Sequence, residues 1–194
     1  FVFTWHNCLK IIELNCLLGD ANNDGSINVT DIVAIIDNVI LMGVQPDNLC
    51  SSDVSGDGIV NVTDIVAIVN IIMGEIARND NTATNATIEI IPNQLSITSN
   101  GSVDGIQLTL KHGSDFNIEL TEVDQTKLEF AFKSSIDKYT TMIVVAKKNL
   151  AFIGTTIGEY EVISHIIVTT DKLGSAIELS TSSTSITEVV DFKL

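Results

Sequence analysis

Two stretches of the chain space oxygen-bearing side chains in a way that could surround a metal ion. Asp20-Ala-Asn-Asn-Asp-Gly-Ser-Ile-Asn-Val-Thr-Asp31 is followed 33 residues later by Asp53-Val-Ser-Gly-Asp-Gly-Ile-Val-Asn-Val-Thr-Asp64. Calcium takes six to eight hard oxygen ligands, and oxygens at loop positions 1, 3, 5, 7, 9 and 12 can wrap around one ion. Glycine at position 6 allows the sharp turn that this wrapping needs. The spacing therefore predicts two calcium ions, one in each loop.

The predicted ligands are defined by their positions in the loops. In the first loop they are Asp20, Asn22, Asp24, the carbonyl of Ser26, Asn28 and Asp31. In the second loop they are Asp53, Ser55, Asp57, the carbonyl of Ile59, Asn61 and Asp64. The alternative is a pair of polar turns that are rich in Asp, Asn and Gly. Two full matches in the same internal register favour calcium.

Each loop leads into an apolar segment that reads as a helix. We expect these helices to begin near Val29 and Val62 and to end at Gly43 and Gly74, because glycine suits a helix C-terminus. No segment of helical length precedes the first loop, so the unit is a loop with an exiting helix only. This arrangement is the F-hand variant of the EF-hand.

The duplicated pattern, over residues 17–74, resembles that of dockerins. The resemblance implies a small α-helical calcium module of secreted bacterial or archaeal proteins, which docks on cohesins, a class of β-sandwich domain. It places partner contacts at loop positions 10 and 11, which are Val29, Thr30, Val62 and Thr63 here. Cellulosomal dockerins commonly carry Ser-Thr at these positions, so the valines depart from that pattern. Two equivalent docking faces are implied; the alternative is that the two helices pack only on each other.

The second half of the chain changes to a period of two, which is typical of strands. Residues 75–87 are polar and are predicted to be a linker, and residues 88–194 are predicted to form an antiparallel β-sandwich. The stretch Val103–Leu110 and the order of the later segments resemble cohesins and related carbohydrate-binding sandwiches. The expected fold class is thus α+β with two domains. The nine expected strands are 88–91, 94–98, 105–110, 116–120, 127–132, 141–146, 160–168, 176–179 and 186–192.

Composition excludes several classes of function. The formal net charge is −15, which argues against nucleic acid and anionic membrane surfaces as partners, because both need basic patches. The longest apolar runs fall far short of the roughly 20 residues that span a membrane. No catalytic motif is present, and His6, His112 and His165 are scattered, so a non-catalytic protein is expected.

Residues 1–16 belong to neither predicted domain. Phe1, Phe3 and Trp5 alternate as in a strand, which could add to the sheet edge of a neighbouring molecule. The alternative is that the segment packs back on the dockerin-like helices through a disulfide. Cys50 could pair with Cys16 or Cys8 in a secreted protein. The chain starts at Phe1 rather than Met, so a mature or trimmed form is expected.

Two sequons, at Asn85 and Asn100, lie outside the calcium loops and are candidate glycosylation sites. The sequence favours an extracellular or cell-surface protein that self-associates head to tail into a filament, through dockerin–sandwich or strand-addition contacts. The alternative is an adaptor whose dockerin anchors a glycan-binding sandwich to a separate cohesin scaffold.

Overall fold

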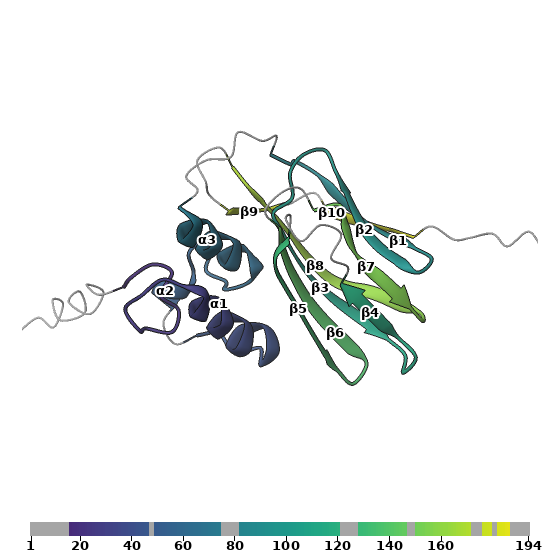
Figure 1. The fold of residues 1–194 in the computed structure, drawn as a ribbon, viewed down its shortest axis with the longest axis horizontal. Helices are drawn as coiled ribbons and strands as arrows, with labels where there is room; N and C mark the ends of the chain where they lie inside the picture. The colour runs from purple at the N-terminus through teal and green to yellow at the C-terminus, as the bar shows by residue number, and fades with distance from the viewer. Residues whose placement is uncertain are drawn as a thin grey trace, which may run out of the picture.

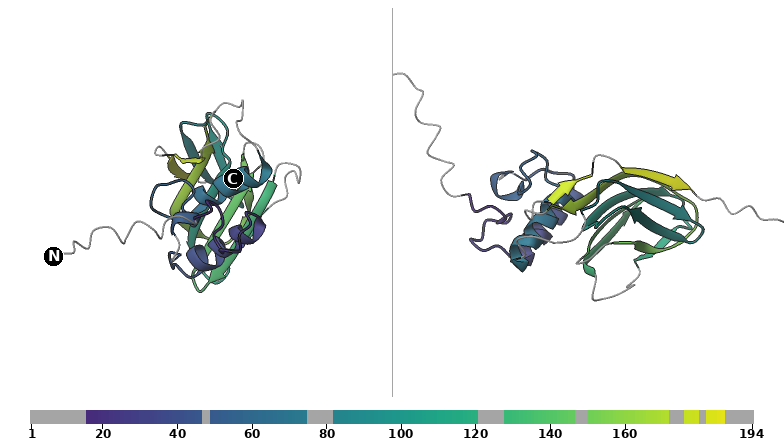
Figure 2. Two further views of the ribbon diagram at one scale, coloured as in Figure 1. Left: turned by 90° about the vertical axis from the view of Figure 1, so that its left-hand side faces the viewer. Right: turned by 90° about the horizontal axis from the view of Figure 1, so that it is seen from above.

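The computed structural model describes residues 16–46, 49–74, 82–120, 128–146, 150–171, 176–179 and 182–186. A helical module comes first and a β-sandwich follows it (Figure 1). Two perpendicular views show the helices together on one side of the sandwich (Figure 2). The predicted strand donor with Phe1, Phe3 and Trp5 lies outside the described residues.

The helical module repeats one local design twice. Its helices are α1 (Val29–Ile35), the π-helical η2 (Ile36–Leu41), α2 (Leu49–Ser52) and α3 (Val62–Met73). Asn28 and Asn61 cap α1 and α3, and each forms a capping box with the Asp three residues later. Gly74 ends α3 in the left-handed region at φ 65°. The first predicted helix is therefore an α-helix that continues as a π-helix, and the second is one regular helix.

The module is closed by a disulfide. Cys16 pairs with Cys50, with a Cα–Cα distance of 6.0 Å and a sequence separation of 34 residues. The bond joins the segment before the first loop to the short helix before the second loop. The Gly19 amide donates to the Ser51 carbonyl at 2.8 Å beside it, which ties the same two segments together.

The sandwich consists of two five-stranded sheets. The first sheet has the order β10-β1-β2-β7-β4, in which β1 and β10 pair in parallel and the other neighbours are antiparallel. The second has the order β5-β6-β3-β8-β9 and is antiparallel throughout. We call the second the helix-facing sheet. The strands are β1 (Ala86–Ile91), β2 (Gln94–Ser99), β3 (Gly105–His112), β4 (Asn117–Leu120), β5 (Leu128–Ile136), β6 (Tyr139–Ala146), β7 (Phe152–Ile157), β8 (Tyr160–Thr170), β9 (Ala176–Glu178) and β10 (Ser182–Ile186).

Eight of the nine predicted strands correspond to described strands, whereas β7 (Phe152–Ile157) was not predicted as a strand, and the two ends of the sandwich also differ. The first begins at Ala86, and Ala83 before it is buried in the sandwich core, so the ordered sandwich reaches into the predicted linker 75–87. Strand β10 occupies Ser182–Ile186 and ends at the first residue of the predicted strand 186–192. Beyond Ile186 that predicted strand is outside the described residues.

Two hydrophobic clusters share the helix-facing sheet. Along β6, Met142, Val144 and Ala146 point into the core between the two sheets. Ile143 and Val145 alternate with them and join a second cluster with the helices. The sheet is thus buried on both faces at this end, by the first sheet and by the helical module. No helix among the described residues is long and apolar enough to cross a membrane.

We expect Cys50→Ser to lower the free energy of unfolding of the helical module by about 2–4 kcal/mol, because the bond restricts the unfolded chain. Denaturant titration of the full chain, followed by circular dichroism, measures this loss. Cys16→Ser should cost the same, and the double variant should cost no more than either single one. A double variant whose loss equals the sum of the two single losses would contradict the pairing.

Candidate calcium loops and docking face

The two loops fold alike around the carboxylate at position 1. Asp20 accepts hydrogen bonds from the amides of Asp24 and Gly25, both at 2.9 Å. Asp53 accepts from the corresponding amides, of Asp57 at 3.1 Å and Gly58 at 2.9 Å. The two position-6 glycines both have φ of 87°, a conformation that other residues rarely adopt. The sharp turn expected from the sequence is therefore present in both loops.

The carboxylate at position 12 closes each loop. Asp31 accepts from the Asn22 amide at 3.2 Å and the Asn28 amide at 2.8 Å. In the second loop Asp64 accepts from the amides of positions 3 and 9, Ser55 and Asn61, both at 2.9 Å. The first and last predicted ligands of each loop are thus bound to its backbone, and the helix that follows starts directly at the loop.

The donor set fits a divalent cation. Asp20, Asp31 and Asp64 are buried, although no Lys or Arg occurs between Lys10 and Arg78 to neutralise them. Burial raises the pKa of Asp64 above its ordinary value, and the hydrogen bonds from Ser55 and Asn61 lower it in part. Buried carboxylates without a basic partner are costly, and a bound cation removes this cost.

Several of the predicted ligands are neutral oxygens rather than carboxylates. In the described residues, no group of three or more His, Cys, Asp and Glu side chains gathers as a metal cluster. Half of each predicted set consists instead of side-chain amide or hydroxyl groups and one backbone carbonyl, which suit calcium. In the first loop these are Asn22, Ser26 and Asn28, and in the second they are Ser55, Ile59 and Asn61.

The helix after the second loop packs against the helix-facing sheet. Val62 and Val66 face Gly105 at the start of β3: a Cβ atom added to Gly105 would lie 2.6 Å from Val66 Cγ2 and 3.6 Å from Val62 Cγ2. Glycine at this position therefore allows the helix to approach the sheet this closely. Val168 and Ala176 belong to the same buried cluster and extend the contact over β8 and β9.

A polar contact lies farther along the same helix. The Asn70 side-chain amide donates to the Thr170 hydroxyl at 3.3 Å, across 100 residues of sequence. The Thr170 amide donates in turn to the Asp104 carboxylate at 2.6 Å, and its carbonyl accepts from the Thr82 hydroxyl at 3.2 Å. The end of β8 is thus bound to α3, to the residue before β3 and to the segment before β1. We call the α3 residues Val62, Thr63, Val66 and Asn70 the α3 face.

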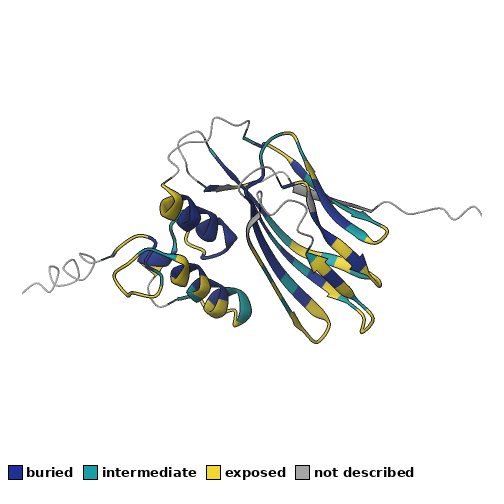
Figure 3. Cartoon of the chain, in the orientation of Figure 1, coloured by how far each residue is buried: buried dark blue, intermediate teal, exposed yellow. Residues whose placement is uncertain are grey.

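The helix after the first loop presents the equivalent residues to solvent. Val29, Thr30 and Val33 are exposed, whereas Val62, Thr63 and Val66, which occupy the same repeat positions, are buried. Figure 3 shows exposed stretches along α1 and a mostly buried α3. The structure therefore places the four predicted partner residues in two different settings. Val62 and Thr63 are buried on the α3 face, and Val29 and Thr30 remain accessible.

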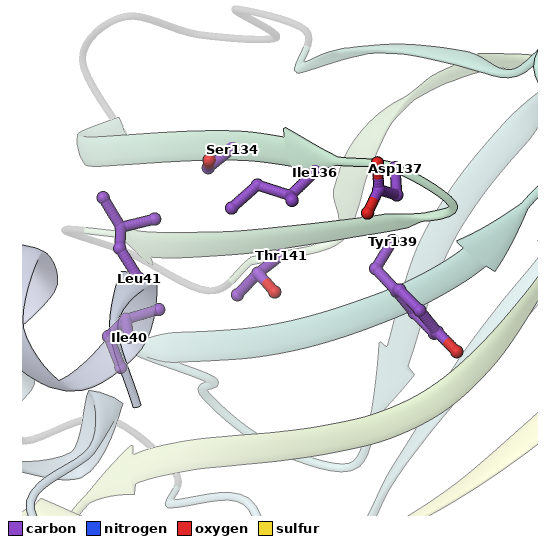
Figure 4. Close-up of a pocket in the computed structure, with 7 residues that line it drawn as sticks. All are labelled: Ile40, Leu41, Ser134, Ile136, Asp137, Tyr139 and Thr141. Atoms are coloured by element: carbon purple, nitrogen blue, oxygen red, sulfur yellow. The ribbon is translucent and has the colours of Figure 1, made fainter. Parts of the chain in front are cut away.

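A small cavity marks the edge of the contact between the two modules (Figure 4). Its volume is about 180 Å³. Ile40 and Leu41 of the helical module line one side, and Ser134, Ile136, Asp137, Tyr139 and Thr141 from the β5–β6 hairpin line the other. The helical module therefore approaches the sheet through η2 as well as α3.

Comparison with known families identifies the helical module. Residues 18–73 match the family model of the dockerin type I domain. This segment is a dockerin domain. Dockerin domains bind calcium, which agrees with the donor set of the two loops. The match covers the helical module and does not extend into the sandwich.

Two solved structures resemble the sandwich. One is a cohesin module from a family 33 glycoside hydrolase of Clostridium perfringens, with 13% identity and a TM-score of 0.32, covering 54% of this chain and all of that one. The other is a non-cellulosomal cohesin from Archaeoglobus fulgidus, with 13% identity and a TM-score of 0.29, covering 56% of this chain and 92% of that one. Likeness of this size establishes neither a partner nor an activity. No curated protein gives a significant match.

The two candidate glycosylation sites lie together at the start of the sandwich. Asn85 and Asn100 are both exposed. The Asn100 side-chain oxygen accepts from the amides of Thr84 and Asn85, at 2.9 and 3.1 Å, and its nitrogen donates to the Thr84 hydroxyl at 2.7 Å. Asn100 thus holds the segment before β1 in place, and its amide nitrogen is already hydrogen-bonded.

Sequence reasoning did not find the sandwich side of the docking contact. Gly105, Thr170 and the outward-facing side chains of β6 carry no chemical motif. One signal was available: the run Met142–Ala146 is continuously apolar, and such runs indicate a strand that is buried on both faces. The same holds for Ile166–Val168 at the end of β8.

We expect Asp24→Ala and Asp57→Ala each to lower thermal stability in millimolar calcium, because each removes one carboxylate from a loop. The loss should be about 2–3 kcal/mol when calcium is about a hundredfold above its dissociation constant, and several degrees in Tm. Differential scanning calorimetry with calcium and with chelator measures it. Asp37→Ala is the matched control, since Asp37 is an exposed acid on η2 outside both loops. Equal melting temperatures for all four proteins in calcium would contradict the assignment.

Proposed function

We propose that this chain is a non-catalytic, extracellular assembly protein, which binds two calcium ions and associates head to tail through its dockerin and its sandwich. The observation that carries the proposal is the fit between the α3 face and the helix-facing sheet around Gly105. One chain supplies both halves of this contact. Extracellular location is supported by the Cys16–Cys50 disulfide, because such bonds persist in oxidising compartments.

Exchange of this contact between copies produces a chain of molecules. If the α3 face of one copy docks on the sheet of the next, every copy donates one surface and accepts one. Such a heterologous contact forms an open filament unless it closes into a ring. Within one chain only residues 75–81 separate Gly74 from Thr82, so the effective concentration of the two surfaces is high. The closed monomer therefore dominates at low concentration, and assembly needs high local concentration.

Strand addition is a second route to the same assembly. The segment with Phe1, Phe3 and Trp5 is a predicted strand, and β4, β5, β9 and β10 are the sheet edges in the described residues. An added strand pairs with such an edge through main-chain hydrogen bonds. The source that fits the dockerin is a bacterium or an archaeon.

We expect deletion of residues 76–80 to convert the monomer into head-to-tail oligomers in calcium, because the shortened connection prevents closure within one chain. Light scattering after size exclusion, together with electron microscopy, measures the change. Adding Val66→Asp to the deletion should return the protein to monomers, since it places a charge on the α3 face. Deletion variants that remain strictly monomeric in calcium at all concentrations would sink the self-association proposal.

The second candidate is an adaptor, and it is favoured by the exposed first repeat. Val29, Thr30 and Val33 reproduce the buried side of α3 and remain free to bind a cohesin-type domain on a separate scaffold. Glycan binding by the sandwich has less support. In its described part, Phe116 stacks with His112 and contacts Tyr160, and Phe116 and Tyr160 pack against the core.

We expect Val33→Asp to abolish binding to any immobilised cohesin-type domain that captures the native chain, because the charge falls in the centre of the exposed face. Val44→Asp is the matched control, since Val44 is also exposed but lies outside the repeated face. Surface plasmon resonance with a panel of cohesin-type domains measures both. Undiminished binding by Val33→Asp would exclude the first repeat as the adaptor surface.

A further inference from the structure

The two dockerin repeats share the same sequence where their helices begin, but these segments are not equivalent in the chain. Val29 is 59% exposed and Val33 is 46% exposed, whereas Val62 and Val66 are 0% and 1% exposed. The heptapeptide Val-Thr-Asp-Ile-Val-Ala-Ile forms α1 and begins α3. The difference in burial therefore comes from the sandwich, which covers one copy and leaves the other open.

In the second repeat, the residues that dock lie between residues that belong to the calcium loop. Val62 and Thr63 directly follow Asn61 and directly precede Asp64, which are loop positions 9 and 12. The Thr63 amide donates to the Asn61 side chain at 2.7 Å, and the Asn61 amide donates to the Asp64 carboxylate at 2.9 Å. The loop and the N-terminal end of the α3 face are thus one hydrogen-bonded turn. Whatever orders this turn also sets the position of Val62 against Gly105.

In the first repeat, the same turn has no such second role. The Thr30 amide donates to Asn28 at 2.9 Å and the Asn28 amide donates to Asp31 at 2.8 Å, as in the second repeat. Val29 and Thr30 are nevertheless exposed, so ordering this turn changes no contact with the sheet. Calcium bound in the second loop would therefore affect the contact with the sheet, whereas calcium bound in the first loop would not.

We propose that calcium in the second loop, and not calcium in the first, holds the dockerin closed on its own sandwich. The inference rests on the proposed binding of two calcium ions and adds a regulatory role for one of them. Coupling between two binding events is reciprocal: if calcium strengthens docking, docking strengthens calcium binding by the same factor. The closed chain thus hides its α3 face and the sheet together while the second loop is loaded.

The first test compares Asp57→Ala with Asp24→Ala in saturating calcium. Both residues hold position 5 of their loops and both are exposed, so neither change touches the docking contact directly. Hydrogen exchange with mass spectrometry reports on α3 and on the segment Val168–Thr170. Asp57→Ala should raise exchange in both segments by about fivefold or more, a typical coupling factor, and Asp24→Ala should leave Val168–Thr170 at the native rate. Equal exchange of Val168–Thr170 in the two variants would overturn the proposal.

The second test works in the opposite direction and leaves every calcium ligand in place. Gly105→Val places a side chain where Val66 Cγ2 now packs, which separates the helix from the sheet. Calcium titration calorimetry should then show one of the two sites weakened by about fivefold or more, with the other unchanged. Thr109→Val is the matched control, because it lies on the same face of β3 at a half-buried position away from Gly105. Unchanged affinities at both sites of Gly105→Val would also overturn the proposal.

The two tests separate this inference from the function on which it rests. A native chain that binds no calcium in the titration would contradict both the inference and the proposed function. In another outcome, the native chain never oligomerises, while Asp57→Ala opens the contact and Asp24→Ala does not. This result would contradict self-association and would support the coupling between calcium and docking. If Asp57→Ala unfolds the dockerin, Gly105→Val decides, since its dockerin loops are intact.

Discussion

The placement of the two modules depends on the close approach of α3 to Gly105. The segment Val62–Met73 is apolar around most of its circumference, and a helix of this kind is stable only when it is covered on more than one side. One side of α3 packs with α1 residues such as Ile32 and Ile35, and the α3 face packs on the sheet. Glycine at position 105 removes the Cβ atom that would otherwise keep Val66 away.

One position that differs between the repeats suits the second repeat to a buried contact with the sheet. Asn70 is buried and its neutral amide donates to the Thr170 hydroxyl, whereas the equivalent residue of the first repeat is the exposed Asp37. Burying a carboxylate there would cost far more than burying an amide that keeps a hydrogen bond. The same valines occur in both helices, and the amide of Asn70 suits burial against the sheet better than a carboxylate at the same repeat position.

The local features of the dockerin could be predicted from the sequence because they depend on neighbours in the chain. Loop spacing, the helix starts at Val29 and Val62 and the helix end at Gly74 all involve partners a few residues apart. The docking of α3 depends on Thr170, which is 100 residues from Asn70, and no local pattern encodes that pairing. Strand β10 was not predicted for a similar reason: Ser182–Ile186 lacks alternation, and its partner strand β1 is distant in the sequence. The partner of Cys50 was left open between Cys8 and Cys16, and the arrangement of α2 beside the first loop decides it.

The parallel pairing of β1 with β10 sets an order of events during synthesis. Ala86 pairs with Ser182, and β9, which borders α3, begins only at Ala176, about 100 residues after α3 ends at Met73. Domains generally fold as units from the N-terminus, so the dockerin helices can form before the sheet that covers α3 is complete. During that interval the valine face of α3 is uncovered on the nascent chain. The chain's own helix-facing sheet is therefore the last part of this contact to be made.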